Sequence, residues 1–375
     1  MKMVRKMIKG GALAAACMLL FLAAVPREAL GADAIDTSKS DCSMEFSLGS
    51  NYAGELNALS VPVTIYKIAD VTASGAYKPG EQYKDIGLQN VSSSTTAEQW
   101  QAMAEEAART ALPKGVLSEV EVSEGEPKKL LVGEKPNDLE ERTVLTGGTG
   151  TIPNLTTGMY LVAAFAVSSE QYTYYFAPYL VSVPGNDYYT TGSDSWLYDV
   201  TVTLKPASVR RWGYLRIIKN LQTYREGDTA SFIFQVEGTK AADTVQAEAY
   251  RYSNVLQYRF DGPGTQNDLL IKLPAGTTGT VTEVGPGAGY RNTGAATQDF
   301  TIAAGDENSA QVATVTFTNE YDGGMNGGTS VVNRFTPTSD GTLTDATEQS
   351  ETNAVSLLSD EPVDPDSIVW DWTQE

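Results

Sequence analysis

The sequence predicts a mainly β protein with two β-sandwich domains in tandem, the first with a helical insertion, followed by a disordered acidic tail. Three observations predict this architecture. Short segments in which apolar and β-branched residues alternate with polar ones recur along the chain, separated by turns rich in Gly and Pro. A length of 375 residues is enough for two domains with separate cores. From residue 323 to residue 375 the composition shifts to Gly and then to Ser, Thr, Asp and Glu.

Residues 1–31 are predicted to be a secretory signal peptide. A basic start precedes an apolar run over residues 12–24, and Ala29-Leu-Gly31 provides the small residues of a cleavage site. No other stretch approaches 18 apolar residues, so the mature chain is not expected to span a membrane. We therefore expect a secreted protein at the cell surface, in the cell wall or in a fimbrium, with its anchoring route left open.

The composition excludes several classes of function. The chain has 27 Lys and Arg against 47 Asp and Glu, a net charge of −20, and such a surface repels nucleic acid and anionic lipid. It has no histidine, which removes Ser-His-Asp and Cys-His catalysis, and we predict no metal and no cofactor. After signal cleavage Cys42 would be the last cysteine, so an internal disulfide cannot stabilise the mature chain. No acidic pair stands out as the carboxylate pair of a glycosidase.

The first domain is predicted to span residues 32–205. Its strand candidates are residues 42–48, 60–70, 156–162 and 176–183. The tyrosines at 172, 174 and 175 are expected to pack between sheets or across strands, whereas an exposed cluster of them would form a sugar-binding platform.

A helix is predicted within this domain. Thr95-Thr-Ala-Glu98 has the pattern of a capping box, and Pro113 ends the helical segment. Its apolar stripe is expected to be core rather than a cofactor site and consists of Trp100, Met103, Ala104, Ala107 and Ala111.

The last strand of the first domain is predicted over residues 196–205. Period-two spacing places one set of side chains on a common face: Trp196, Tyr198, Val200, Val202 and Leu204. Lys205 then points the other way, next to a short linker predicted over residues 206–212.

The second domain is predicted to span residues 213–322, and three of its strands carry reactive residues on their apolar faces. Lys219 shares a face with Leu215 and Ile217 in the first strand. Glu283 shares a face with Val281, and Asn319 shares a face with Val315 and Phe317. A lysine, a glutamate and an asparagine directed into one core are costly unless they meet one another.

Such a meeting has a chemical outcome. Burial lowers the pKa of a lysine, so its amine becomes a nucleophile. A neighbouring acid can polarise the asparagine carboxamide and carry the proton as ammonia leaves. The product is an intramolecular Lys–Asn isopeptide bond.

This pattern resembles the Cna B-type (SpaA-like) domains of Gram-positive surface proteins and pilins, which have an Ig-like fold. The resemblance covers residues 213–321 and rests on Gly213-Tyr-Leu-Arg-Ile-Ile-Lys219, Leu273-Pro-Ala-Gly276 leading to Val281-Thr-Glu-Val284, and Phe317-Thr-Asn-Glu-Tyr321. In that family a lysine on the first strand bonds an asparagine on the last strand, with an acid between them. The resemblance implies a crosslink between Lys219 and Asn319 that Glu283 promotes.

The first domain is similar to the N-terminal domain of sortase-assembled pilins. Trp196, Val200, Val202 and Lys205 fit the spacing of the pilin motif, in which the lysine accepts the C-terminus of the next subunit. Thr203-Leu204 and the proline at 206 depart from the usual motif, and no LPxTG-type signal is present. Lys67 occupies a first-strand position, but no acid and asparagine accompany it, so no isopeptide bond is expected in this domain.

These expectations combine into a secreted cell-surface or fimbrial (pilus) structural subunit, stabilised by the isopeptide bond and contributing to adhesion, and not an enzyme. Its expected partners are other pilin subunits, a sortase and a host or glycan ligand. The alternative is a surface adhesin or carbohydrate-binding module that is not polymerised into a pilus. The partner of the Trp370 and Trp372 patch in the tail is open.

Overall fold

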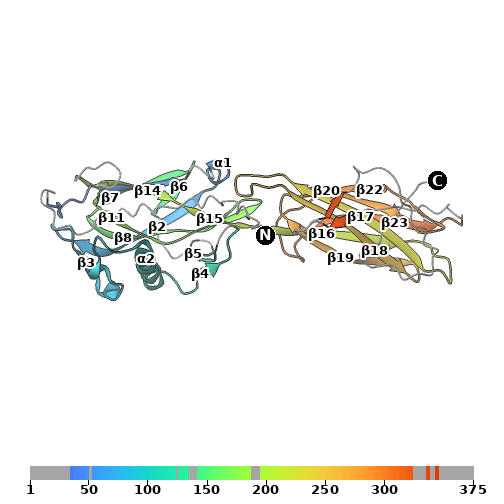
Figure 1. Ribbon diagram of the computed structural model, residues 1–375, viewed down its shortest axis with the longest axis horizontal. Helices are drawn as coiled ribbons and strands as arrows, with labels where there is room; N and C mark the ends of the chain where they lie inside the picture. The colour runs from blue at the N-terminus through green and yellow to red at the C-terminus, as the bar shows by residue number, and fades with distance from the viewer. Residues whose placement is uncertain are drawn as a thin grey trace, which may run out of the picture. The chain divides into compact units, whose positions relative to one another are not determined.

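The computed structural model describes residues 34–49, 53–123, 126–133, 135, 142–186, 195–323, 335–337 and 343–345. The predicted signal peptide lies outside these residues, as does most of the tail predicted for 323–375. The chain is mainly β and divides into two compact units, residues 1–210 and 211–375, each of which contains a β-sandwich (Figure 1). In the described part of the chain, no helix combines the length and the apolar character needed for a membrane span.

Three sheets make up most of the first unit. The central sheet has the order β11-β8-β2-β3, with β6 also paired to β2, and its strands are β2 (Val61–Val71), β3 (Tyr77–Pro79), β6 (Thr143–Leu145), β8 (Gly158–Ala164) and β11 (Tyr179–Val183). The second sheet has the order β14-β1-β7, from β1 (Cys42–Leu48), β7 (Thr149–Leu155) and β14 (Asp199–Leu204). The third has the order β15-β10-β5-β4, with β9 paired to β10, from β4 (Leu117–Val120), β5 (Lys128–Leu131), β9 (Val167–Ser168), β10 (Tyr172–Phe176) and β15 (Pro206–Arg210).

Smaller elements complete the first unit. β12 (Gly185–Asn186) pairs with β13 (Trp196–Leu197). The helical elements are α1 (Ala53–Leu56), η2 (Glu81–Tyr83), η3 (Leu88–Asn90) and α2 (Ala97–Ala111).

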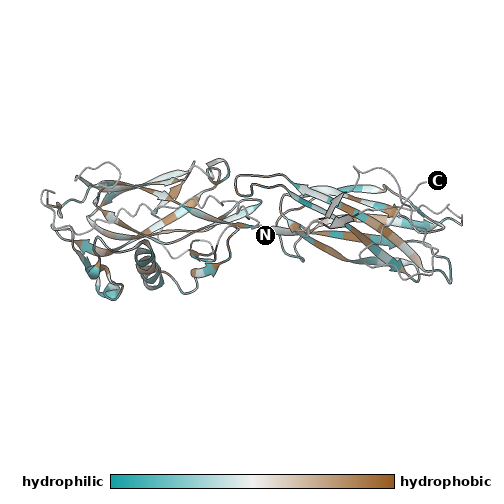
Figure 2. Cartoon of the chain, viewed as in Figure 1, coloured by the Kyte–Doolittle hydropathy of each residue, from teal (hydrophilic) through white to brown (hydrophobic). Residues whose placement is uncertain are grey.

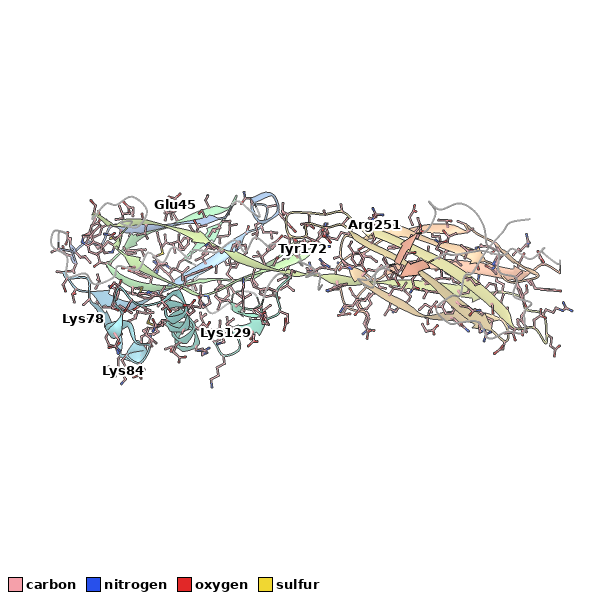
Figure 3. The ribbon with its side chains drawn as sticks, viewed as in Figure 1. Glu45, Lys78, Lys84, Lys129, Tyr172 and Arg251 are labelled. Atoms are coloured by element: carbon pink, nitrogen blue, oxygen red, sulfur yellow. The ribbon has the colours of Figure 1, made fainter. Side chains whose placement is uncertain are left out.

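The central sheet is buried on both faces, and β8 is buried along its whole length. Met159, Leu161 and Ala163 belong to one core cluster, which also contains the buried face of α2. Tyr160 and Val162, which alternate with them, belong to a second cluster that also contains the inward side chains of β1 and β14. Glu45 of β1 points to the surface (Figure 3). The central sheet of the first unit therefore packs against the β14-β1-β7 sheet on one face and against α2 on the other.

The helix forms where the sequence predicts it, but its cap lies one residue later than expected. Thr96, and not Thr95, is the N-cap: its Oγ1 accepts the Gln99 backbone N–H at 3.3 Å, and the Gln99 Oε1 accepts the Thr96 backbone N–H at 2.8 Å. Thr95 instead accepts the backbone N–H of Ser92. Of the predicted stripe, Ala111 is only partly buried, and Ala108 is fully buried in addition. The stripe is core, as expected.

The end of the first unit differs from the sequence prediction in two ways. Trp196 lies in β13 and packs against the cluster that contains α2, whereas Val200, Val202 and Leu204 of β14 pack in the other cluster. Tyr198 packs against the same cluster as β14. The common face expected for the five residues is therefore wrong for Trp196, because the strand is interrupted at Tyr198.

The segment expected as a linker, residues 206–212, is mostly strand. β15 pairs antiparallel with β10, and Trp212 begins the first strand of the second unit. The sequence of this segment does not show the alternation of apolar and polar residues that is typical of a strand. It begins with Pro206, and the next two residues, Ala207 and Ser208, are small and both buried. The chain continues from one unit to the next with Arg211 between the strands.

The second unit consists of two four-stranded sheets with one core between them. One sheet has the order β19-β16-β23-β21, from β16 (Trp212–Leu221), β19 (Gly264–Pro274), β21 (Tyr290–Asn292) and β23 (Ala313–Tyr321). The other has the order β18-β17-β20-β22, from β17 (Ala230–Lys240), β18 (Tyr250–Phe260), β20 (Thr278–Gly285) and β22 (Thr297–Thr301). Hydrophobic residues alternate with polar ones along these strands, as Figure 2 shows by colour. The alternation of apolar and polar residues therefore predicts which face of each strand in the second unit is buried.

Two short strands lie in the segment that was expected to lack regular structure. β24 (Phe335–Pro337) pairs antiparallel with β25 (Leu343–Asp345). The composition of the segment, rich in Ser, Thr and Asp, did not predict this hairpin.

Gly213 provides a test of the packing at the start of β16. A Cβ built on Gly213 would lie 1.8 Å from the backbone oxygen of Ala303, whereas nothing lies within 4 Å of a Cβ on Gly262. We expect Gly213→Ala to destabilise the second unit by about 1–3 kcal/mol through overpacking. Gly262→Ala should change its stability by less than about 0.5 kcal/mol. Calorimetric unfolding of the two variants checks this, and equal midpoints for both would contradict it.

Candidate functional site

The structure brings Lys219, Glu283 and Asn319 together inside the second unit. Lys219 lies on β16 and Asn319 on β23, which are adjacent parallel strands of one sheet, with Leu221 opposite Asn319 in the register. Glu283 lies on β20 in the facing sheet. Each of the three side chains lies on the buried face of its strand. Two sheets therefore contribute to one polar cluster in the core, which we call the Lys–Glu–Asn cluster.

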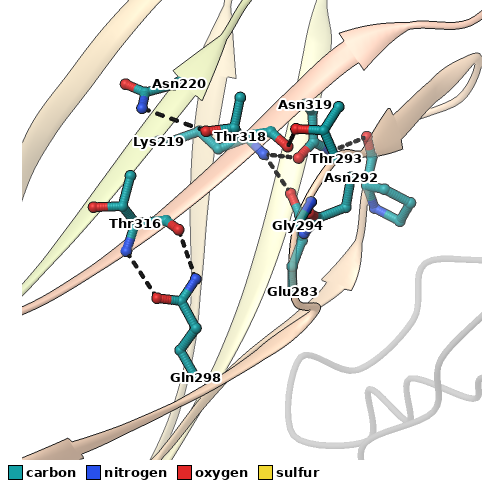
Figure 4. Close-up of polar contacts among 11 residues, drawn as sticks. Lys219, Asn220, Glu283, Asn292, Thr293, Gly294, Gln298, Thr316, Thr318 and Asn319 are labelled. Atoms are coloured by element: carbon teal, nitrogen blue, oxygen red, sulfur yellow. Dashed lines mark hydrogen bonds and ion pairs between the residues drawn. The ribbon is translucent and has the colours of Figure 1, made fainter.

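The contacts within the cluster are direct (Figure 4). The Lys219 Nζ donates to the Glu283 Oε1 at 2.6 Å, and it also donates to the Asn319 Oδ1. The Asn319 Nδ2 donates to the backbone oxygen of Pro286 at 3.2 Å. A backbone carbonyl accepts and cannot donate, so this last bond fixes the carboxamide with its oxygen toward Lys219.

The cluster is shielded from water. Lys219 and Asn319 have no exposed surface, and Glu283 is 6% exposed. The Lys219 Nζ lies 4.2 Å from the ring centroid of Phe232, and the Phe234 ring is also nearby. Burial lowers the pKa of Lys219 from 10.5 to about 8, although the charge of Glu283 and its hydrogen bond act in the opposite direction. A neutral amine is therefore accessible near neutral pH.

Two irregularities in strand pairing position the lysine and the glutamate. The register of β16 against β19 shifts between Ile217 and Lys219, and the register of β17 against β20 shifts beside Glu283. The Tyr258 hydroxyl bonds two backbone groups at the first irregularity. It donates to the Ile217 backbone oxygen at 2.7 Å and accepts the Leu269 backbone N–H at 3.0 Å. Burial raises the pKa of Tyr258 to about 12, so it keeps the proton that this bridge needs. Such bulges redirect side chains without ending a strand.

Sequence reasoning missed several residues around the cluster. Asn292 of β21 donates from its Nδ2 to the Glu283 Oε2, and Phe232 and Phe234 of β17 cover Lys219. The alternation in β17 agrees with the burial of the two phenylalanines, but it does not show what they contact. Nothing in the sequence around Asn292 distinguishes it from the other asparagines of the chain.

The residues of the predicted pilin motif lie in the first unit. Val200 and Val202 are buried, and Trp196 is partly buried. Lys205 is half-buried between β14 and β15, and its backbone oxygen accepts from the Tyr179 hydroxyl at 3.4 Å. These positions give Val200 and Val202 a packing role.

Lys67 has a different environment from Lys219. Its Nζ pairs with the Asp70 Oδ1 at 2.6 Å and donates to the Thr156 Oγ1, and its side chain is 33% exposed. Lys67 is paired in regular register with Tyr160 of β8, and the register of β2 against β8 shifts only after it, between Lys67 and Ala69.

The tyrosines of β10 do not form the exposed platform that the alternative function needs. Tyr172 and Tyr174 are 1% and 0% exposed, and the Tyr174 hydroxyl donates to the Glu55 Oε2. Among the described residues, no group of three or more Cys, Asp or Glu side chains could hold a metal ion.

Comparison with known families gives a match to part of the chain. A family model described as a domain of unknown function (DUF5979) matches residues 215–322, which include the whole Lys–Glu–Asn cluster. No curated protein matches the chain.

Solved structures that resemble the chain include Gram-positive pilins. A streptococcal ancillary pilin is 14% identical, with 78% of this chain and 70% of that chain covered and a TM-score of 0.22. The major pilin SpaD from Corynebacterium diphtheriae is 13% identical, with 76% and 99% covered and a TM-score of 0.24. The TIE protein of Bacillus anthracis is 12% identical, with 82% and 41% covered and a TM-score of 0.27. At such TM-scores, function must be argued from the residues of this chain.

The lowered pKa of Lys219 predicts a pH dependence in a variant that cannot form a bond. In Asn319→Ala, the unfolded chain binds a proton on Lys219 between pH 8 and 10.5, but the folded chain does not. The free energy of unfolding of the second unit should therefore rise with pH across this window, by up to about 1.4 kcal/mol per pH unit. Amide hydrogen exchange in β16 measures it. The double variant Lys219→Met, Asn319→Ala should lack the rise, and parallel curves for the two variants would contradict the assignment.

Proposed function

We propose that the chain is a secreted cell-surface or fimbrial structural subunit whose second unit is locked by an isopeptide bond between Lys219 and Asn319. The observation that carries the proposal is the buried contact of the Lys219 Nζ with both the Glu283 carboxylate and the Asn319 carboxamide. A nucleophile, an acid and an acyl group then share one dry site. Glu283 promotes the reaction, in which the chain acts once on itself and not as an enzyme with turnover.

The reaction proceeds by acyl transfer from the asparagine carboxamide. Transfer of a proton from the Lys219 Nζ to the Glu283 Oε1 gives a neutral amine and a carboxylic acid, and removes the cost of two buried charges. The amine lone pair attacks the Asn319 Cγ, and the new Nζ–Cγ bond forms. The acid delivers a proton to the Asn319 Nδ2, the Cγ–Nδ2 bond breaks, and ammonia leaves while the second Nζ proton returns to Glu283.

The bond would join the first and last strands of the second unit, β16 and β23. The two residues are 100 positions apart in sequence. Closing a loop of that length lowers the entropy of the unfolded chain, and for a disulfide of the same span the stabilisation is about 4.7 kcal/mol. Such a crosslink would take the place of the disulfides that small secreted domains commonly use.

The location and assembly parts of the proposal rest on the sequence. The predicted signal peptide, the excess of acidic residues and the resemblance of residues 213–321 to Cna B-type domains support an exported surface protein. The alternative of an unpolymerised carbohydrate-binding adhesin loses its main support, since Tyr172 and Tyr174 are buried.

Intact-mass measurement tests the bond. We expect the wild-type chain to be lighter than its calculated mass by one ammonia, and Lys219→Ala, Asn319→Ala and Glu283→Gln each to have the full calculated mass. Lys240→Arg is the matched control, because Lys240 is also a buried lysine paired with an acid, Asp243, in the same unit. It should keep the loss of ammonia. A wild-type chain at full mass would refute the bond.

Co-expression with a pilus-assembling sortase and a pilin that carries an LPxTG-type signal tests polymerisation. If Lys205 accepts the C-terminus of another subunit, high-mass ladders should form with the wild-type chain and disappear with Lys205→Ala. Lys78 and Lys84, exposed lysines of the first unit (Figure 3), serve as controls, and their substitution by Ala should leave the ladders intact. Ladders that persist in Lys205→Ala would exclude Lys205 as the acceptor.

A further inference from the structure

We propose that Asn292 is a positioning residue that keeps the proton of Glu283 on the oxygen facing Lys219. This inference rests on the proposed isopeptide bond and identifies a residue that acts through the acid. The Glu283 carboxyl group has both oxygens engaged: Oε1 contacts the Lys219 Nζ, and Oε2 accepts from the Asn292 Nδ2. The two contacts come from different strands of the facing sheet, β16 and β21.

The orientation of the Asn292 carboxamide is fixed by its own partner. The Asn292 Oδ1 accepts the backbone N–H of Gly294 at 2.7 Å. A backbone N–H can only donate, so the oxygen of the carboxamide must face Gly294 and its NH₂ must face Glu283. The assignment of the two amide atoms therefore follows from the hydrogen-bond network.

The main chain around Asn292 is also held in place. Asn292 pairs with Asn319 across β21 and β23. The next residue, Thr293, donates its backbone N–H to the Thr318 oxygen at 2.9 Å, and its hydroxyl donates to the same oxygen. The strand that carries the electrophile Asn319 thus also anchors the residue that orients the acid.

The chemical consequence concerns the neutral acid formed during the reaction. Because the Asn292 NH₂ can only donate, the Glu283 Oε2 must remain an acceptor, and the proton of the carboxylic acid must lie on Oε1. Oε1 is the oxygen in contact with the Lys219 Nζ. The proton that must reach the leaving Nδ2 of Asn319 therefore stays on the side of the acid where the bond is made.

Two substitutions separate this role from simple packing. Asn292→Asp keeps the shape and the acceptor for Gly294, but it places an acceptor opposite Oε2 and so draws the proton of the acid to the wrong oxygen. Asn292→Ala removes the donor without adding an acceptor. We expect bond formation to be slower by about tenfold or more in Asn292→Ala, since positioned proton transfer contributes 10²–10⁴-fold in rate. Asn292→Asp should be slower still.

The rates are measured on the full chain. Cell-free synthesis is quenched in denaturant at set times, and intact mass gives the fraction of chain that has lost ammonia. Asn254→Asp is the control, because Asn254 is an exposed asparagine on β18 whose Oδ1 also accepts a backbone N–H. It should react at the wild-type rate. Unfolding of each substitution in an Asn319→Ala background confirms that the second unit is folded at the temperature used.

The outcomes distinguish the inference from the proposal beneath it. A wild-type chain that never loses ammonia overturns the isopeptide bond and this inference with it. A bonded wild-type chain with Asn292→Asp as fast as wild type, or faster than Asn292→Ala, overturns the role of Asn292 alone. Slowing in the order wild type, Asn292→Ala, Asn292→Asp supports it.

Discussion

The burial of the Lys219 ammonium group is the constraint on which the second unit depends. A lysine without exposed surface, packed against Phe232 and Phe234 of β17, is strongly unfavourable unless its charge is neutralised and its hydrogen bonds are made. The ion pair with Glu283 and the hydrogen bond to Asn319 meet that requirement only when both sheets are in place. Such a pair need not be worth more than a well-packed apolar cluster, so stability alone does not explain its presence. Conversion of two of its members to a neutral amide would remove the buried charge and keep the strands joined.

The same constraint organises the surrounding backbone. The register shifts beside Lys219 and Glu283 would leave backbone groups without partners, and the Tyr258 hydroxyl crosses the core to bond two of them. Asn292 then occupies the second oxygen of Glu283. Polar groups in this core are thus connected in a network in which each member limits the orientation of the next. A network of this kind specifies one arrangement of the strands more strictly than apolar packing does.

Much of this arrangement could be predicted from the sequence, because period two fixes which side chains share a face. Alternation placed Lys219, Glu283 and Asn319 on the buried faces of their strands. It failed where the backbone departs from regular pairing. The interruption at Tyr198 separates Trp196 from Val200. The role of Asn292 depends on a contact between strands that no local pattern encodes.

The central claim is a covalent bond between two named side chains, and a tryptic digest analysed by tandem mass spectrometry tests it most directly. Trypsin cuts after lysine and arginine but not after a lysine whose amine is acylated. The account predicts a branched peptide in which residues 217–225 are joined through Lys219 to residues 292–334 through Asn319, with one ammonia missing. Recovery of the linear peptides 217–219, 220–225 and 292–334, with no branched species, would contradict it.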